Sequence, residues 1–203
     1  MSRGQRLAVI ALLGGAAILR VLLVASLENK PYFYRPVVDS DAYDRWGQEI
    51  AQRDFVGKRV FYQDPLYPYF LGITYKIFGR DLYLVRLLQI ALGVLGCWML
   101  FETARRLADF RTGMAALILA SFYKPFLFYE TALLKEFLAV VLVEATLLLL
   151  VLAREKRWAG LAGGITFGLA ILVRANLLLV ALLLTGFFLL KNRRGALLLA
   201  AGV

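Results

Sequence analysis

The sequence predicts an all-α polytopic membrane protein, and three observations carry that prediction. Hydrophobic residues make up 61% of the 203 residues, and the mean hydropathy is +0.71, whereas soluble domains are about 45–50% apolar. The apolar residues form long blocks rather than scattered or heptad patterns, which excludes a disordered chain and a coiled coil. Basic residues gather in the connections between those blocks.

The composition also excludes several kinds of chemistry. Histidine is absent, so catalysis by histidine and metal ligation by histidine are both ruled out. The single cysteine, Cys97, lies inside an apolar run, so neither an internal disulfide nor a thiolate metal cluster can form.

Six ranges are long and apolar enough, or nearly so, to cross a bilayer, which takes roughly 17–25 residues. They are 7–27, 82–102, 112–129, 131–152, 158–173 and 176–190. The last two are separate spans, because a single helix over 158–190 would be about 50 Å long at 1.5 Å per residue. The apolar run from Gly195 to Val203 indicates a truncated seventh span. We therefore expect residues 1–203 to be the N-terminal part of one transmembrane domain, with 7–27 as an uncleaved first span, 28–81 as an external loop and 82–203 as the remaining spans.

The charge distribution predicts the orientation of these spans. If the chain changes sides at each span, the cytoplasmic segments contain eleven basic residues and only three acidic residues. The external loop 28–81 contains eight basic and eight acidic residues. Basic loops stay in the cytoplasm. This accounts for the net charge of +10 without nucleic acid. We expect a multi-pass protein of the plasma (inner) membrane with a cytoplasmic N-terminus.

The external loop contains the most unusual polar residues. Residues 39–54 place Tyr43, Trp46 and Ile50 on one helical face, which is typical of a helix lying in the membrane interface. Its first turn carries Asp39, Asp41 and Asp44. These acids either cap the helix, or at least one of them has a chemical role. The aromatic segment 61–70 either anchors the loop at the interface or lines a cleft for an isoprenoid or a sugar.

Ionisable residues also occur within or at the ends of the predicted spans, where a charge requires a partner or a polar cavity. They are Arg20, Arg86, Lys135, Glu136, Glu144 and Arg174. Arg20 and Arg86 are close enough to the external ends to extend to the interface, which is the interpretation we favour for Arg86. Lys135 either pairs locally with Glu130 and Glu136 or joins a site for a phosphate and a proton transfer. The glycines at 160, 164 and 168 predict a close helix–helix contact.

Taken in order, these motifs resemble the GT-C superfamily of membrane glycosyltransferases, in particular the bacterial relatives of the protein O-mannosyltransferases and of the lipid A aminoarabinose transferases. The resemblance spans about residues 1–190. It rests on Asp39-Ser-Asp-Ala-Tyr43, Asp64-Pro-Leu-Tyr-Pro68, Phe78-Gly79, Arg86, Tyr129 with Glu136, and Gly168 to Arg174. A basic residue often precedes the proline segment in that family, whereas this chain has Gln63-Asp64.

The resemblance implies the roles of the candidate residues. Asp39 matches the catalytic acid of the first loop, with Asp41 as the alternative. The residues expected to bind substrate are Tyr43, Glu136, Lys135, Arg174, Arg20, Asp64 and Tyr67. Carboxylates suit Mg²⁺ or Mn²⁺, so a divalent metal on Asp39, Asp41 and Glu136 stays an open option.

The function expected from this resemblance is sugar transfer from a polyprenyl-phosphate donor to a glycan, lipid or protein on the external face. Asp39 would be the general base of an inverting attack. The alternatives are half of a transporter or flippase, a non-catalytic scaffold, or an inactive piece of the enzyme. Transporters often contain inverted repeats and helices broken at the midplane, but this chain shows no internal repeat, and its break at Arg174–Asn176 lies at the end of a span.

Overall fold

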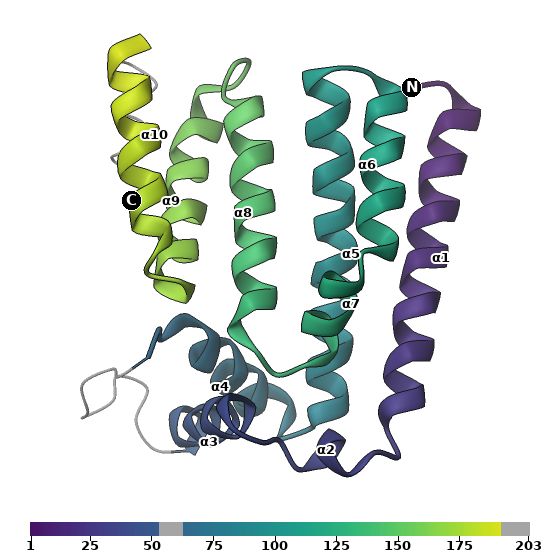
Figure 1. Cartoon of the computed structure of the whole chain (residues 1–203), viewed down its shortest axis with the longest axis vertical. Coiled ribbons are helices and arrows are strands. Elements are labelled where there is room, and N and C mark those ends of the chain that lie inside the picture. Colours follow the sequence, from purple (N-terminus) through teal and green to yellow (C-terminus); the bar gives the residue numbers. More distant parts are fainter. Residues whose placement is uncertain (53–62, 192–203) are drawn as a thin grey trace.

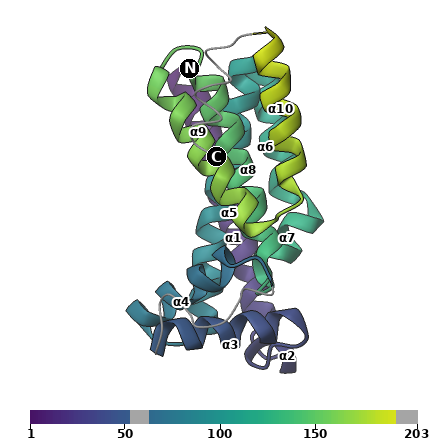
Figure 2. The same ribbon diagram turned by 90° about the vertical axis from the view of Figure 1, so that its left-hand side faces the viewer.

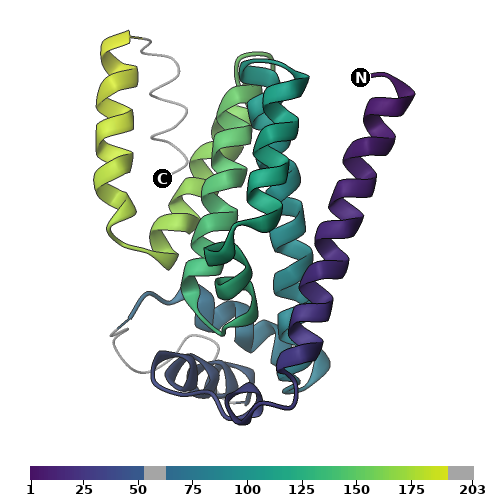
Figure 3. The same cartoon turned by 45° about the vertical axis from the view of Figure 1, so that its right-hand side comes forward.

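The computed structural model describes residues 1–52 and 63–191, and every regular element in these ranges is a helix. The all-α prediction is therefore confirmed. The predicted seventh span, residues 53–54 and residues 61–62 lie outside the described residues. Six helices stand side by side in a bundle (Figures 1 and 3): α1 (Arg3–Leu27), α5 (Leu82–Leu107), α6 (Phe110–Phe122), α8 (Lys135–Leu152), α9 (Arg157–Val173) and α10 (Leu177–Lys191).

The other helices of the described residues occupy one end of this bundle. They are α2 (Pro31–Tyr34), α3 (Asp39–Gln52), α4 (Leu66–Phe78) and, beside α5, α7 (Lys124–Thr131). Figures 1 and 2 show α3 and α4 packed together beyond the ends of α8 and α9. The N-terminus and the connections α5–α6 and α8–α9 lie at the opposite end (Figure 1). The bundle therefore has two distinct ends: α3, with its three aspartates, lies at one end, and the basic connections lie at the other.

Two helices of the described residues, α1 and α5, are each long and apolar enough to cross a membrane, and the bent pair α6 and α7 makes a third if it is one span. The other predicted spans form helices that are shorter or more charged: α8 has 18 residues with three ionisable side chains, α9 has 17 residues and α10 has 15. The count of six spans stays a prediction.

Local sequence signals explain where the helices begin. Ser2 and Gln5 form a capping box at α1. The carboxylate of Asp81 accepts from the backbone N–H groups of Tyr83 and Leu84 at the start of α5, and Asp109 caps α6 in the same way. Gly79, with φ +80°, ends α4 in a conformation that favours glycine.

The predicted span 112–129 is not one continuous helix, because the chain bends by 51° between α6 and α7. Pro125 has no N–H with which to continue the helix to the carbonyl of Ser121. The guanidinium of Arg20 takes that place: Nη1 donates to the Ser121 carbonyl at 3.0 Å, and Nη2 to that of Ala120 at 3.5 Å. A side chain of α1 thus satisfies the carbonyls that the bend leaves without partners.

Close backbone approach joins α3 to α4. A Cβ at Gly47 would lie 2.8 Å from Cβ of Leu71, and one at Gly72 would lie 2.5 Å from Cγ2 of Ile50. Both distances are too short for any side chain, so the two glycines let the helices touch. The buried face of α3 includes Tyr43 and Ile50 as predicted, but it also includes Asp44 and Gly47.

The glycine-rich face of α9 packs against α8, which confirms the predicted helix–helix contact. Gly160, Gly163 and Gly164 are buried, and a Cβ at Gly163 would lie 3.4 Å from the side chain of Leu149. Gly168, which the motif included, is half-buried. Figure 1 shows α9 beside α8 along most of its length.

Candidate active site

A cleft of about 660 Å³ opens among α5, α7, α8 and α10. Its walls are mostly apolar and are supplied by all four helices, for example by Leu100, Phe126, Val143 and Val180. Its polar lining residues are Tyr129, Glu136, Glu144, Arg174 and Asn176. The cleft therefore combines a hydrocarbon-like interior with a few charged groups, as ligand sites commonly do.

Arg174 and Glu136, two of the predicted substrate-binding residues, meet at this cleft. Arg174 follows the last residue of α9, and Glu136 lies in the first turn of α8. Their closest nitrogen and oxygen are 3.9 Å apart, and the side chain of Arg174 is 46% exposed. Exposed pairs of this kind contribute little to stability. The guanidinium is thus available to an anionic ligand.

Lys135, another predicted substrate-binding residue, lies outside the cleft. Its ammonium pairs with the carboxylate of Asp64, just before Pro65, and both side chains are mostly buried. The alternative that Lys135 pairs locally with Glu130 and Glu136 is wrong. The pair joins the loop that precedes α4 to the start of α8, and neither residue lines the cleft.

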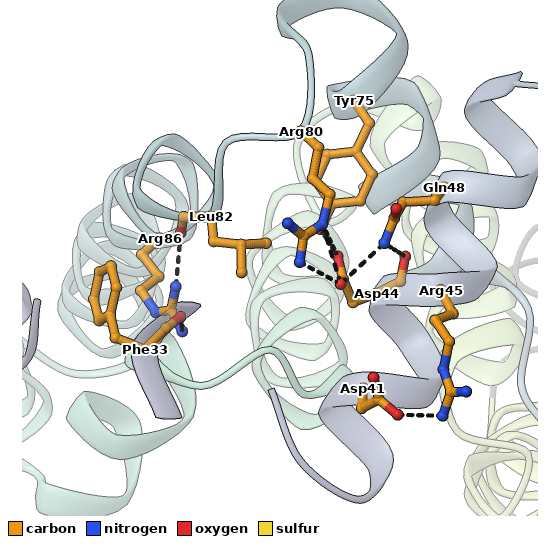
Figure 4. A network of polar contacts seen from close by, with 9 residues as sticks. All are labelled: Phe33, Asp41, Asp44, Arg45, Gln48, Tyr75, Arg80, Leu82 and Arg86. Atoms are coloured by element: carbon orange, nitrogen blue, oxygen red, sulfur yellow. Dashed lines mark hydrogen bonds and ion pairs between the residues drawn. The ribbon is translucent and has the colours of Figure 1, made fainter. Parts of the chain in front are cut away.

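The three acids at the start of α3 have different surroundings. Asp39 is exposed, and no hydrogen bond or ion pair joins its carboxylate to another residue of the described ranges. Asp41 pairs with Arg45 one turn further along the same helix. Asp44 is buried and accepts hydrogen bonds from Tyr75 at 2.7 Å and from Arg80 at 2.7 Å. Figure 4 shows Asp44 between these two residues and Gln48.

The Asp44 network is the group that sequence reasoning missed. Burial raises the pKa of the Tyr75 phenol, and its hydrogen bond to Asp44 adds to the rise. The hydrogen bond to Asp44 likewise raises the pKa of Arg80. Gly47 lies three residues after Asp44, on the same helical face, and a glycine within a helix was the available signal that this face touches another backbone.

Tyr43 and Tyr67 lie in the core that supports the loop. Both are buried, and their rings meet edge to face with centroids 5.4 Å apart. The hydroxyl of Tyr67 donates to Oε1 of Gln89 at 2.7 Å, and Nε2 of Gln89 donates to the backbone carbonyls of Glu130 and Ala132 at 2.8 and 2.9 Å. Neither tyrosine lines the cleft.

The two arginines expected near the interface are buried instead. Arg20 is 1% exposed, and its Nε donates to the carboxylate of Glu130 at 2.6 Å. Arg86 is 4% exposed. It donates to the backbone carbonyls of Thr131 and Phe33 at 2.8 and 3.0 Å and lies over the Phe33 ring, as part of Figure 4 shows. The prediction that Arg86 extends to the interface is therefore wrong, because backbone carbonyls satisfy it within the fold.

The proposed metal ligands do not come together as a set. Within the described residues, no three side chains of His, Cys, Asp or Glu are grouped so that they could hold a metal ion. Asp41 faces Arg45, and Glu136 faces Arg174.

Comparisons with known proteins agree with the helical architecture. Residues 63–201, well over half of the chain, match the family described as dolichyl-phosphate-mannose-protein mannosyltransferase. No curated protein matches the chain, and no solved structure matches it. The family match includes the whole of the cleft. On this evidence the chain belongs to the dolichyl-phosphate-mannose-protein mannosyltransferase family, a family of membrane glycosyltransferases of the GT-C type.

Proposed function

We propose that the protein transfers a sugar from a polyprenyl-phosphate-linked donor to an acceptor glycan, lipid or protein, and that the donor phosphate binds at Arg174. The observation that carries this proposal is a half-exposed guanidinium at a cleft that adjoins an apolar groove at Pro125. A lipid-linked sugar phosphate offers an anion to the guanidinium and an apolar chain to the groove. The family match supports the general reaction class.

Arg174 is the best phosphate ligand among the three basic residues expected from the sequence. The guanidinium of Arg20 is already bonded to Glu130 and to backbone carbonyls, and the ammonium of Lys135 is already paired with Asp64. A guanidinium offers two parallel N–H donors to phosphate oxygens, and a phosphate would replace the long contact with Glu136. The same charge would stabilise the phosphate as it leaves.

Asp39 is the proposed general base. Its carboxylate takes the proton of the acceptor hydroxyl or amine while that oxygen or nitrogen forms a bond to the anomeric carbon. The bond from the anomeric carbon to the phosphate oxygen breaks at the same time, and polyprenyl phosphate leaves with that electron pair. Attack opposite to the leaving group inverts the anomeric configuration. Among the three acids at the start of α3, Asp39 alone is exposed and has no protein partner in the described ranges.

The reaction is assigned to the external face of the plasma membrane. Asp39, Glu136 and Arg174 belong to the loop or to helix ends that the charge distribution puts outside. The ends of α3, α8 and α9 that carry them lie toward the same end of the bundle (Figure 1). The metal option plays no part in the steps above.

The test of the base is Asp39→Asn, measured as transfer from a radiolabelled polyprenyl-phosphate sugar by the full-length protein in membrane vesicles. Asparagine begins a helix about as well as aspartate, but an amide accepts no proton at neutral pH. We expect normal expression and transfer reduced about 10²-fold or more. Glu49→Gln, an exposed acid on the same helix, is the matched control and should keep full activity.

Two results would reassign or refute the role of Asp39 as the general base. If Asp41→Asn abolishes transfer and Asp39→Asn does not, the base is Asp41. If both variants remain active, the mechanism is wrong.

Phosphate binding is tested separately at Arg174. Arg174→Ala should raise the KM for the donor more than Arg174→Lys does, and equal kinetics in both variants and wild type would exclude Arg174 from phosphate binding.

A further inference from the structure

Glu144 is a buried acid that nothing described above uses. It lies on α8 eight residues beyond Glu136, roughly 12 Å deeper at 1.5 Å per residue. It is 5% exposed, and no hydrogen bond or ion pair joins it to another residue of the described ranges. It lines the cleft and also a separate void of about 20 Å³ that it shares with Glu130.

The neighbouring helix leaves space for this carboxyl. A Cβ at Gly96 of α5 would lie 2.1 Å from Oε2 of Glu144, so no other residue type fits there without displacing the acid. One turn earlier, Gly93 makes the same room for Glu130, whose Oε1 would lie 2.4 Å from a Cβ. The surface of α5 is thus shaped around two acids, of which only Glu130 has a protein partner.

A polar group at this depth requires a hydrogen-bond partner, because buried groups without one are costly. The void has room for about one water molecule, which could bridge the two carboxyls. Glu144 also lines the cleft, so a ligand bound there can supply the remaining hydrogen-bond partner.

The charges around Glu144 favour an uncharged ligand group as its hydrogen-bond partner. At the depth of Glu144 an anionic group would meet the carboxyls of Glu144 and Glu130 together, and Arg20 is already paired with Glu130. A hydroxyl group suits Glu144 in either protonation state, since it donates to a carboxylate and accepts from a carboxylic acid.

We propose that Glu144 binds a hydroxyl group of the sugar carried by the lipid-linked donor, so that the cleft admits the sugar rather than the isoprenoid chain. This inference rests on the proposed function. With the phosphate at Arg174, one directly attached sugar ring would extend toward Glu144 along α8. The isoprenoid chain has a place outside the cleft, because an apolar groove at the bend between α6 and α7 adjoins the cleft at Pro125.

The test measures the affinity of the protein in lipid nanodiscs for two probes, dolichyl phosphate mannose and dolichyl phosphate. For Glu144→Leu we expect affinity for the mannose-bearing lipid to fall about tenfold, as for the loss of one buried hydrogen bond, and affinity for dolichyl phosphate to stay within about twofold. Glu144→Gln, which can still donate and accept, should retain most of the affinity. Leu147→Val, an apolar change in the same cleft wall, is the matched control and should not distinguish the two lipids.

Monodeoxy analogues of the mannose-bearing lipid test the idea without relying on the folding of a variant. At least one should bind wild type about tenfold more weakly and show no further loss with Glu144→Leu. Equal effects of Glu144→Leu on both lipids, no effect on either, or full affinity of wild type for every analogue would overturn the inference. Failure of the proposed function looks different: wild type would bind neither lipid, or Arg174→Ala would leave both affinities unchanged.

Discussion

Replacing Arg20 by methionine should destabilise the protein strongly, although Arg20 takes no part in the proposed chemistry. The side chain is 1% exposed, and its charge is balanced by the carboxylate of Glu130 at 2.6 Å. Removing one member of a buried ion pair leaves the other without compensation and costs about 3–5 kcal/mol. For a chain of this size such a loss lowers Tm by about 6–20 °C.

A double-mutant cycle separates the stability contributed by the Arg20–Glu130 ion pair from that of the other hydrogen bonds of Arg20. Glu130→Gln removes the charge but leaves Arg20 bonded to the carbonyls at the end of α6, so we expect a smaller loss of about 1–3 kcal/mol. The double variant Arg20→Met/Glu130→Gln leaves no uncompensated charge. It should therefore be at least about 1.5 kcal/mol more stable than the sum of the single losses implies, although the Ser121 carbonyl still lacks its donor.

Thermal unfolding in detergent micelles, followed by circular dichroism, measures all three variants beside wild type. Leu19→Met, a change on the same helix at a side chain that is 37% exposed, controls for the introduction of methionine. If Arg20→Met costs less than about 1 kcal/mol, a value typical of an exposed pair, the Arg20–Glu130 pair does not hold the bundle together. Strict additivity in the cycle would contradict the direct contact.

The remaining predictions concern packing, the loop and topology. Gly96→Ala should cost about 1–3 kcal/mol in a thermal melt because the new methyl group overlaps the carboxyl it faces, whereas Gly14→Ala, with nothing within 4 Å, should be neutral or slightly stabilising; equal effects would show that Gly96 is not in close contact. Asp44→Ala should cost about 1–3 kcal/mol by leaving a buried phenol without its acceptor, and faster proteolysis within α3 would reveal it; unchanged proteolysis would mean that the network does not hold the helix. Single cysteines at Gln63 and Gly79, with the native cysteine replaced, should both react with an impermeant thiol reagent in intact cells, and labelling of Gly79 only after the membrane is opened would overturn the assignment of the loop to the outside.

Regular features of the fold could be predicted from local sequence. The apolar blocks located the helices, and the break at Arg174 correctly separated α9 from α10. Arg174 lies near Glu136 because the short turn over 153–156 makes α8 and α9 a hairpin, so that α9 ends where α8 begins. These inferences depend on spacing within one or two helices, which a single sequence displays directly.

Pairings between distant segments could not be predicted in this way. Arg20 and Glu130 are 110 residues apart, and nothing local distinguishes an arginine that has a buried partner from one that extends to the interface. A charged side chain is ordinarily exposed, so nothing local predicts that Asp44 is buried, where Tyr75 and Arg80 from the following segment donate hydrogen bonds to it. The bend at Tyr123 was missed because Pro125 also fits the first turn of a new helix, and composition alone does not separate one bent span from two helices.

The distance in sequence between Arg20 and its partner has a consequence for how the protein is made. A ribosome adds about 5–20 residues per second, so the 110 residues between Arg20 and Glu130 take roughly 5–20 s to synthesise. During that interval α1 carries a cation whose partner acid has not been made, although α5 is synthesised before it. We expect the Arg20 side chain to extend toward the interface until α7 brings the acid that pairs with it.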